Sequence, residues 1–121
     1  MVVDDERHIV RFLSYLLTTQ GYEVAVAYDG EEALEVAASF SPDGMLLDLQ
    51  LPKLSGQEVL ERLRADPRFA RLKIFVLSGC PYDGDPDDTS KASADVRCSK
   101  PIAPSTLIRT LREHGLAPSP A

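Results

Sequence analysis

The chain alternates short apolar runs with longer segments in which apolar residues recur every three or four positions. Short runs of this kind are typical of buried strands, and the longer period is typical of amphipathic helices. Strands are predicted at residues 1–3, 22–28, 44–48, 73–78 and 95–99, and helices at about 9–17, 31–40, 57–64 and 104–114. Because strands and helices alternate, the pattern favours one α/β domain, a parallel sheet with helices on both faces.

One segment breaks this alternation. Residues 79–90 contain Pro81, Gly84 and Pro86 together with four aspartates, a composition that favours a loop. Asp85 and Pro86 can still cap and open a short helix, so the fourth helix is expected to be short or irregular. The last residues, 117–121, are expected to form a frayed tail or the stub of a linker.

Composition and charge narrow the class of protein. With 44% hydrophobic and 26% charged residues in 121, the chain has the composition of an ordinary globular domain. A net charge of −6 disfavours direct binding of nucleic acid through a broad basic face. No apolar stretch approaches the ~20 residues of a membrane span, and no signal-peptide pattern opens the chain, so we expect a cytoplasmic protein without membrane contact.

The few cysteines and histidines give weaker signals. Cys80 and Cys98 are the only cysteines, and without a secretory signal they are expected to be free thiols. His8 and His114 lie far apart in the sequence. We expect both histidines to face solvent rather than to take part in catalysis.

Polar residues end several of the predicted strands, namely Asp4, Asp5, Asp48, Ser78 and Lys100. Because the carboxyl ends of parallel strands meet at one edge of the sheet, these side chains are expected to converge there. Two carboxylates ~4 Å apart repel by about 4 kcal/mol at an effective dielectric near 20, and one lysine offsets only one of three charges. The remaining charge of −2 favours a divalent cation, and Mg²⁺ prefers carboxylates together with water and phosphate oxygens.

Such a site can support phosphoryl transfer. A carboxylate flanked by Mg²⁺ and an ammonium can attack phosphorus and form an aspartyl phosphate. Lys100 and the metal can neutralise the phosphoryl oxygens, and the Ser78 hydroxyl can donate to one of them. Taken singly, each position has a plainer interpretation: a helix cap for the aspartate pair, a turn residue for Asp48, and a solvated side chain for Lys100.

The chain resembles the receiver domains of two-component response regulators. The resemblance covers nearly the whole chain and rests on Val2-Val3-Asp4-Asp5-Glu6, Leu46-Leu47-Asp48-Leu49, Leu51-Pro52, Gly56, Ser78-Gly79 and Lys100-Pro101, in order and with matching spacings. It implies a flavodoxin-like fold of five βα units, a three-layer sandwich whose parallel five-stranded sheet has the order 2-1-3-4-5. Residues 1–116 would form the receiver domain, and residues 117–121 a flexible tail or linker.

The resemblance also implies roles for the acidic residues. Asp48 would accept a phosphoryl group from a sensor histidine kinase or a histidine phosphotransfer protein. Asp5 would bind Mg²⁺ (or Mn²⁺) directly, Asp4 largely through water, and Gln50 through its backbone carbonyl. The domain would signal by a change of conformation and would catalyse only its own phosphorylation and dephosphorylation.

The remaining positions follow from the same resemblance. Ser78 would bind the phosphoryl group and move towards it, and Lys100 would pair with the phosphate. The bond to Pro101 would be cis, as in the family. Gln50 and Cys80 would flank the attacking water and tune the lifetime of the phosphoryl group. The downstream partner or fused output domain is not identified by the sequence, and homodimerisation stays open.

The sequence departs from the family pattern in two places. Receivers usually have an aromatic switch residue three positions before the conserved lysine, but this chain has Arg97. The acidic, proline-containing fourth helix is part of the surface that reports phosphorylation in relatives. It is either a solvated acidic loop or an output face that does not form the common homodimer.

Two other functions remain as alternatives. Arg97 and the broken fourth helix are compatible with a receiver-like interaction module that works without phosphorylation. A haloacid-dehalogenase-type phosphatase also uses a nucleophilic aspartate, but it needs a second aspartate two residues later, where this chain has Gln50.

Overall fold

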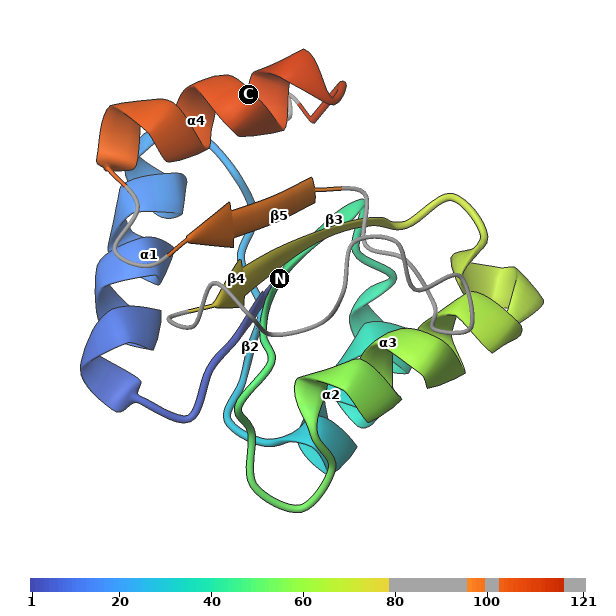
Figure 1. Ribbon diagram of the computed structural model, residues 1–121. Coiled ribbons are helices and arrows are strands. Elements are labelled where there is room, and N and C mark those ends of the chain that lie inside the picture. Colours follow the sequence, from blue (N-terminus) through green and yellow to red (C-terminus); the bar gives the residue numbers. More distant parts are fainter. Residues whose placement is uncertain (79–95, 100–102, 117–121) are drawn as a thin grey trace.

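The computed structural model describes residues 1–78, 96–99 and 103–116 and contains a five-stranded parallel sheet (Figure 1). Its strands are β1 (Val2–Val3), β2 (Val26–Ala27), β3 (Gly44–Asp48), β4 (Lys73–Ser78) and β5 (Val96–Ser99). They lie in the order β2-β1-β3-β4-β5, and every neighbouring pair is parallel. This is the sheet order that the resemblance to receiver domains implies, and the prediction is confirmed.

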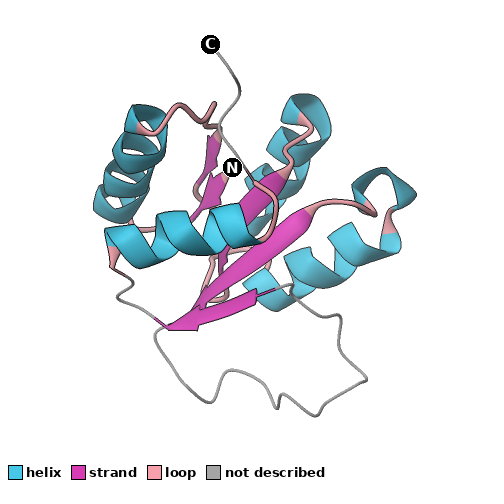
Figure 2. Cartoon of the chain, turned by 90° about the horizontal axis from the view of Figure 1, so that it is seen from above, coloured by secondary structure: helices cyan, strands magenta, loops and turns pink. Residues whose placement is uncertain are grey.

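Helices cover both faces of the sheet and complete three layers, as the view from above also shows (Figure 2). They are α1 (Arg7–Thr19), α2 (Gly30–Phe40), α3 (Gly56–Ala65) and α4 (Pro104–Glu113), with one turn of 3₁₀ helix, η1, at Pro67–Phe69. Each of the four α-helices matches a predicted one. The segment predicted as a short fourth helix lies outside the described residues, as does the predicted tail.

Alternation along the strands divides the apolar side chains between two cores. On one face, Val3 and Leu47 pack with α2 and α3. On the other face, Val2 and Leu46 pack with α1 and α4. Because successive strand residues point to opposite faces, residues two positions apart share a face of the sheet. This alternation decides which polar residues meet beyond the strand ends.

Local capping fixes where α2 and α3 begin. The Asp29 carboxylate accepts a hydrogen bond from the Glu32 N–H at 2.8 Å, and the Ser55 hydroxyl accepts one from the Glu58 N–H at 3.2 Å. The Glu32 bond, together with Lys53 Nζ at 3.6 Å, lowers the pKa of Asp29 below its usual value. Both caps satisfy amides that a helix N-terminus leaves without an intrahelical partner.

The second strand is shorter than predicted. The alternation at residues 22–28 predicts a long strand, whereas β2 comprises only Val26–Ala27. In the described sheet β2 is an edge strand, and the strand that it pairs with, β1, is itself two residues long. The hydrogen bonds between them run from the Val2 N–H to the Ala25 carbonyl at 2.9 Å and from the Asp4 N–H to the Ala27 carbonyl at 3.2 Å. The length of β2 is therefore limited by the length of β1, and the alternation of residues 22–28 carries no information about β1.

One of the two expectations about histidines is wrong. His8 faces solvent as predicted, with 79% of its side chain exposed. His114 is half-buried instead: its ring meets Phe75 edge to face at 5.5 Å, and its Nδ1 lies 2.9 Å from the Thr110 carbonyl oxygen. A histidine ring has an apolar body and a polar tip, so it can pack against the core while one nitrogen is satisfied, and position near a helix end does not decide its exposure.

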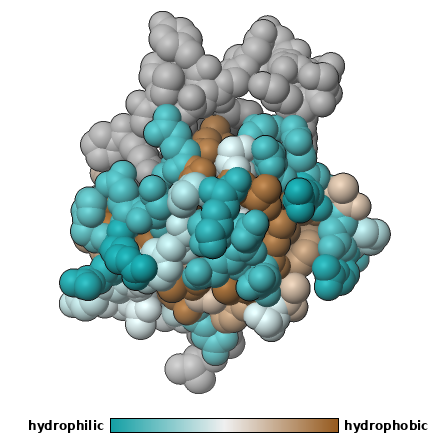
Figure 3. Space-filling model, turned by 90° about the horizontal axis from the view of Figure 1, so that it is seen from below, coloured by the Kyte–Doolittle hydropathy of each residue, from teal (hydrophilic) through white to brown (hydrophobic). Residues whose placement is uncertain are grey.

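Three smaller observations bear on the sequence analysis. Cys98 is a free thiol whose pKa is raised by burial, while Cys80 lies outside the described residues. Among the helices described, none combines the length and apolarity needed to cross a bilayer. The surface seen from below is mainly hydrophilic, with smaller apolar patches between the polar side chains (Figure 3).

Candidate functional site: a carboxylate cluster at the sheet edge

The strand register places two aspartates side by side. Val3 of β1 pairs with Leu47 of β3, so the next residues along the two strands are Asp4 and Asp48. Both carboxylates are buried, with Asp4 1% and Asp48 5% exposed, whereas Asp5 is exposed. Buried carboxylates are rare unless they are paired, hydrogen-bonded or bound to a cation. Neighbouring strand ends therefore bring two costly charges together at one edge.

The third carboxylate completes a cluster. One oxygen from each of Asp4, Asp5 and Asp48 lies within 4.8 Å of the others. Carboxylate oxygens are the hard donors that Mg²⁺ and Ca²⁺ prefer, and three negative charges at this spacing exceed what one divalent cation neutralises. The donor set of this cluster thus fits a hard divalent cation.

Backbone amides orient two of these carboxylates. The Glu6 N–H donates to Asp4 Oδ1 at 3.0 Å, and the Gln50 N–H donates to Asp48 Oδ1 at 3.1 Å. Each bond spans two residues and turns the chain just after the strand ends, which is the usual local behaviour of an aspartate in a turn. The bonds also bring the Gln50 backbone next to Asp48.

The loop after Asp48 is held by close packing at two glycines. A Cβ atom on Gly56 would lie 2.3 Å from the Asp48 carbonyl oxygen and 2.4 Å from Leu49 Cα, and the Gly56 N–H donates to the Leu49 carbonyl at 2.9 Å. A Cβ atom on Gly30 would lie 2.3 Å from the Leu54 carbonyl oxygen. The beginnings of α2 and α3 therefore approach the β3–α3 loop as closely as only glycine allows.

The other predicted site residues are placed less completely. Asp48 pairs with Leu77, so Ser78 is the next residue along β4 at the same edge of the sheet, and it pairs with Ser99 of β5. The side chains of Ser78 and Arg97 are outside the described part of the chain. Three predicted residues lie wholly outside it: Cys80, Lys100 and Pro101. Of the predicted set, the structure brings together Asp4, Asp5, Asp48 and the Gln50 backbone.

Two residues near this edge were not predicted. The Arg7 guanidinium carbon lies 4.4 Å from the centroid of the Tyr28 ring, a cation–π contact. Tyr28 directly follows β2, just as Asp4 and Asp48 follow or end their strands. The aspartates were predicted because they stand at the carboxyl ends of strands. The same rule selects Tyr28, but only once β2 is known to end at Ala27.

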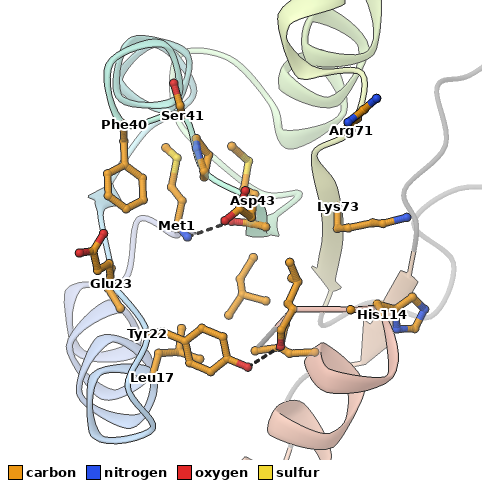
Figure 4. A pocket seen from close by; sticks show the side chains of 18 residues that line it. Met1, Leu17, Tyr22, Glu23, Phe40, Ser41, Asp43, Arg71, Lys73 and His114 are labelled. Carbon is orange, nitrogen blue, oxygen red and sulfur yellow. Dashed lines mark hydrogen bonds between the residues drawn. The ribbon is translucent and has the colours of Figure 1, made fainter. Parts of the chain in front are cut away.

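A pocket of about 400 Å³ lies at the opposite edge of the sheet (Figure 4). Its lining includes Met1, which precedes β1, and the first residues of β3 and β4, Gly44 and Lys73. His114 also lines it. The Tyr22 hydroxyl donates to the Leu116 carbonyl there at 2.7 Å. This pocket is thus separated from the carboxylate cluster by the length of the strands, and the cluster is the better candidate for chemistry.

Open doubly wound α/β sheets bind their ligands outside the carboxyl ends of the strands, which is where this chain places its carboxylate cluster. The model of the response regulator receiver domain family matches residues 1–112 of this chain. The chain belongs to this family, the phosphoacceptor domains of two-component signalling.

Individual relatives agree with this assignment. The chain is 40% identical over 104 residues to the alkaline phosphatase synthesis transcriptional regulatory protein PhoP of Bacillus subtilis, covering 86% of this chain and 42% of PhoP. It is 29% identical over 114 residues to the polar-differentiation response regulator DivK of Brucella anthropi, covering 94% of this chain and 93% of DivK. The chain therefore spans less than half of PhoP but nearly all of DivK.

Solved structures show the same fold. The response regulator TrrA of Thermotoga maritima, solved in complex with Mg²⁺ and BeF, has a TM-score of 0.82 and 32% identity, covering 93% of this chain and 95% of TrrA. The receiver domain of the sensor histidine kinase PA1611 of Pseudomonas aeruginosa also has a TM-score of 0.82, with 27% identity and coverage of 93% and 92%. That structure holds a magnesium ion in its active-site cleft.

Proposed function

We propose that this receiver domain is a Mg²⁺-dependent phosphoacceptor in which Asp48 takes a phosphoryl group from a histidine kinase or a histidine phosphotransfer protein. The observation that carries the proposal is the cluster of Asp4, Asp5 and Asp48, with one oxygen of each within 4.8 Å of the others. Asp48 is the member that ends β3 at the centre of the sheet, between β1 and β4. Family membership supports the same role.

Four groups would hold the cation, three of them directly. We assign direct ligation to Asp5, Asp48 and the Gln50 backbone carbonyl, and ligation largely through water to Asp4. When bound, Mg²⁺ supplies positive charge against the oxygens of the transferring phosphoryl group. The Mg²⁺-containing structures of TrrA and PA1611 support this assignment, and Mn²⁺ is proposed as a substitute of similar coordination.

The chain's own residues would carry the transfer. An oxygen of Asp48 forms a bond to phosphorus as the P–N bond of a phosphohistidine donor breaks, and the imidazole leaves with the bonding electron pair. Lys100 would pair with the phosphoryl oxygens, and the Ser78 hydroxyl would donate to one of them. Hydrolysis later returns the Asp48 carboxylate and free phosphate. The domain would act on itself alone and would not turn over a separate substrate as an enzyme.

We place the remaining assigned residues on the route from Asp48 to a partner. Gln50 and Cys80 would control access of the hydrolytic water. Arg97 stands where relatives have an aromatic switch, so the signal would reach the partner protein or output domain by a different side-chain movement. Pro101 would fix the chain direction just after Lys100. Homodimerisation on phosphorylation is a separate outcome that sedimentation with and without a phosphoryl mimic would detect.

Chemical mapping tests the proposal directly. The protein is incubated with acetyl phosphate and MgCl₂, and its intact mass is measured. We expect one added phosphoryl group that is stable in acid and labile in base, and that does not form when EDTA replaces MgCl₂ in the incubation. Borohydride reduction converts an aspartyl phosphate to homoserine, and peptide sequencing should find that change at residue 48. No adduct, or homoserine at another aspartate, would contradict the proposal and favour a phosphorylation-independent module.

We also propose that residues 1–116 make up the receiver domain and that 117–121 are a tail. α4 ends at Glu113, but Leu116 still belongs to the packed domain: its N–H donates to the Leu111 carbonyl at 2.9 Å, and its carbonyl accepts from the Tyr22 hydroxyl at 2.7 Å. The Leu116 side chain packs against the α1–α4 core.

This boundary gives a prediction for Tyr22→Phe. Removing the hydroxyl deletes a part-buried hydrogen bond and should lower the free energy of unfolding by about 1 kcal/mol. Denaturant unfolding of the parent, of Tyr22→Phe and of a chain ending at Leu116 measures the effect. The shortened chain should match the parent; a loss of stability in it greater than that of Tyr22→Phe would place residues 117–121 inside the domain.

A further inference from the structure

The inference starts from a row of side chains across the end of the sheet. Val2 of β1 pairs with Val26 of β2 on one side and with Leu46 of β3 on the other, and all three pack into the α1–α4 core. Two residues further along the three segments stand Tyr28, Asp4 and Asp48, and the Asp4 N–H donates to the carbonyl of Ala27, the residue before Tyr28, at 3.2 Å. Because neighbouring strands lie about 4.8 Å apart, Tyr28 flanks Asp4 on the side opposite Asp48.

Arg7 is tied to this row by the Tyr28 ring. It is the first residue of α1 and lies two positions after Asp5, the third member of the carboxylate cluster. Its guanidinium carbon is 4.4 Å from the Tyr28 ring centroid. Tyr28 is itself half-buried against the α1–α4 core, so the ring is a fixed platform rather than a second mobile group. The contact thereby restrains an exposed arginine at the ring of Tyr28, the residue that flanks Asp4, instead of leaving its side chain free to sample solvent.

A fixed positive charge at this place acts in opposite directions on the two charged species that reach the site. It repels a divalent cation from the carboxylate cluster and attracts the dianionic phosphoryl group of a small donor. Arg7 is exposed, so both effects act through solvent and fall with ionic strength; the Debye length is about 10 Å at 0.1 M salt and about 3 Å at 1 M.

We propose that Arg7, positioned by its contact with Tyr28, sets the charge at the mouth of the carboxylate cluster, weakening Mg²⁺ binding while recruiting anionic phosphoryl donors. Arg7 is a positioning residue for the donor and takes no part in bond making. The inference rests on the proposed phosphoacceptor function, since it assigns a determinant of donor and metal affinity to that same site.

The test measures metal binding and phosphorylation separately. In Arg7→Gln at low ionic strength, isothermal titration should show Mg²⁺ binding on the order of threefold to tenfold tighter, from the loss of repulsion between the two cations through solvent. At saturating Mg²⁺, the second-order rate constant for phosphorylation by acetyl phosphate should fall by a similar factor. Both changes should shrink to less than twofold in 1 M NaCl.

Matched variants separate placement from charge alone. Arg11→Gln removes the same exposed charge one turn further along α1 and should change neither measurement. Tyr28→Leu removes the platform and should reproduce part of the Arg7→Gln effect, whereas Tyr28→Phe keeps the ring and should behave as the parent. The double variant Arg7→Gln/Tyr28→Leu should equal Arg7→Gln, because the ring acts only through the guanidinium.

The outcomes distinguish this inference from the proposed function. A parent that is phosphorylated on Asp48, with Arg7→Gln binding Mg²⁺ no more tightly, overturns the role of Arg7 and leaves the phosphoacceptor intact. Equal effects in Arg7→Gln and Arg11→Gln also overturn it, because then net charge rather than position decides. A parent that takes up no phosphoryl group contradicts the proposed function itself, and titration with Mg²⁺ alone then still reports whether Arg7 repels the cation.

Discussion

Asp48→Asn is expected to remain unphosphorylated by acetyl phosphate and, in EDTA, to unfold at a higher temperature than the parent. Asp48 is 5% exposed beside Asp4, which is 1% exposed, and their cluster holds three carboxylate oxygens within 4.8 Å. Unit charges at such distances repel by roughly 3–4 kcal/mol at an effective dielectric near 20, and the neutral amide removes part of this. The amide oxygen of the new side chain can still accept the hydrogen bond that the Gln50 N–H makes to Asp48 Oδ1. We expect a gain of about 1–2 kcal/mol in the metal-free state.

Magnesium should reverse this order. A ligand that binds only the folded state stabilises it by RT ln(1 + [L]/Kd), about 2.7 kcal/mol at 100 times Kd. The parent should therefore gain stability on addition of MgCl₂, and Asp48→Asn should gain much less because one ligand has lost its charge.

A matched control lies at the other end of the same strand. Asp43 is exposed and immediately precedes β3, so Asp43→Asn removes one negative charge far from the cluster. Thermal unfolding of all three proteins in EDTA and in saturating MgCl₂ gives the comparison. Because the Asp43 carboxylate attracts the buried Met1 ammonium, Asp43→Asn should be no more stable than the parent in EDTA, and it should gain as much from MgCl₂ as the parent does. If Asp48→Asn were less stable than the parent in EDTA, or gained as much from MgCl₂, the cluster would not be a repulsive cation site.

The α/β class and the acidic edge could be anticipated because both depend on local signals. Apolar runs that stop at a charged residue, such as the one ending at Asp48, mark where strands end. The alternation of strands and helices makes those ends coincide. The family resemblance then supplied the order of the strands. Among the described residues, the carboxylates that meet at that edge are those of Asp4, Asp5 and Asp48. Their meeting follows from where the strands end and from the alternation of strands and helices.

Other features depend on pairing that the sequence does not display. The length of β2 is set by the two residues of β1 rather than by its own alternation. The contact of Arg7 with Tyr28 needs the register of β2 against β1, and the burial of His114 needs Phe75 to lie beneath α4. All three features depend on contacts between elements that are far apart along the chain, so the sequence of one segment alone does not predict them.

Gly56→Ala is expected to destabilise the domain by about 3 kcal/mol and to weaken Mg²⁺ binding. The new methyl group would lie 2.3 Å from the Asp48 carbonyl oxygen, 2.4 Å from Leu49 Cα and 3.0 Å from the Asp48 carbonyl carbon. All three are backbone atoms of the segment that ends β3, so no side-chain rotation can relieve the overlap. Either α3 moves away from the sheet, breaking the 2.9 Å bond from the Gly56 N–H to the Leu49 carbonyl, or the Asp48 backbone moves. A displaced Asp48 backbone moves its carboxylate out of the cluster.

Gly44→Ala separates this effect from overpacking in general. A methyl group there would also meet an atom at 2.3 Å, but that atom is Leu116 Cδ1, the end of a flexible side chain at the opposite edge of the sheet. Leu116 can change rotamer, so we expect a loss of about 1 kcal/mol and no change in Mg²⁺ affinity. Denaturant unfolding and Mg²⁺ titration, both under conditions in which the two variants are folded, make the comparison. The prediction is wrong if the two variants lose equal stability, or if Gly56→Ala binds Mg²⁺ as tightly as Gly44→Ala does. Either result would mean that α3 shifts as a unit and that the position of Asp48 does not depend on the close approach of Gly56.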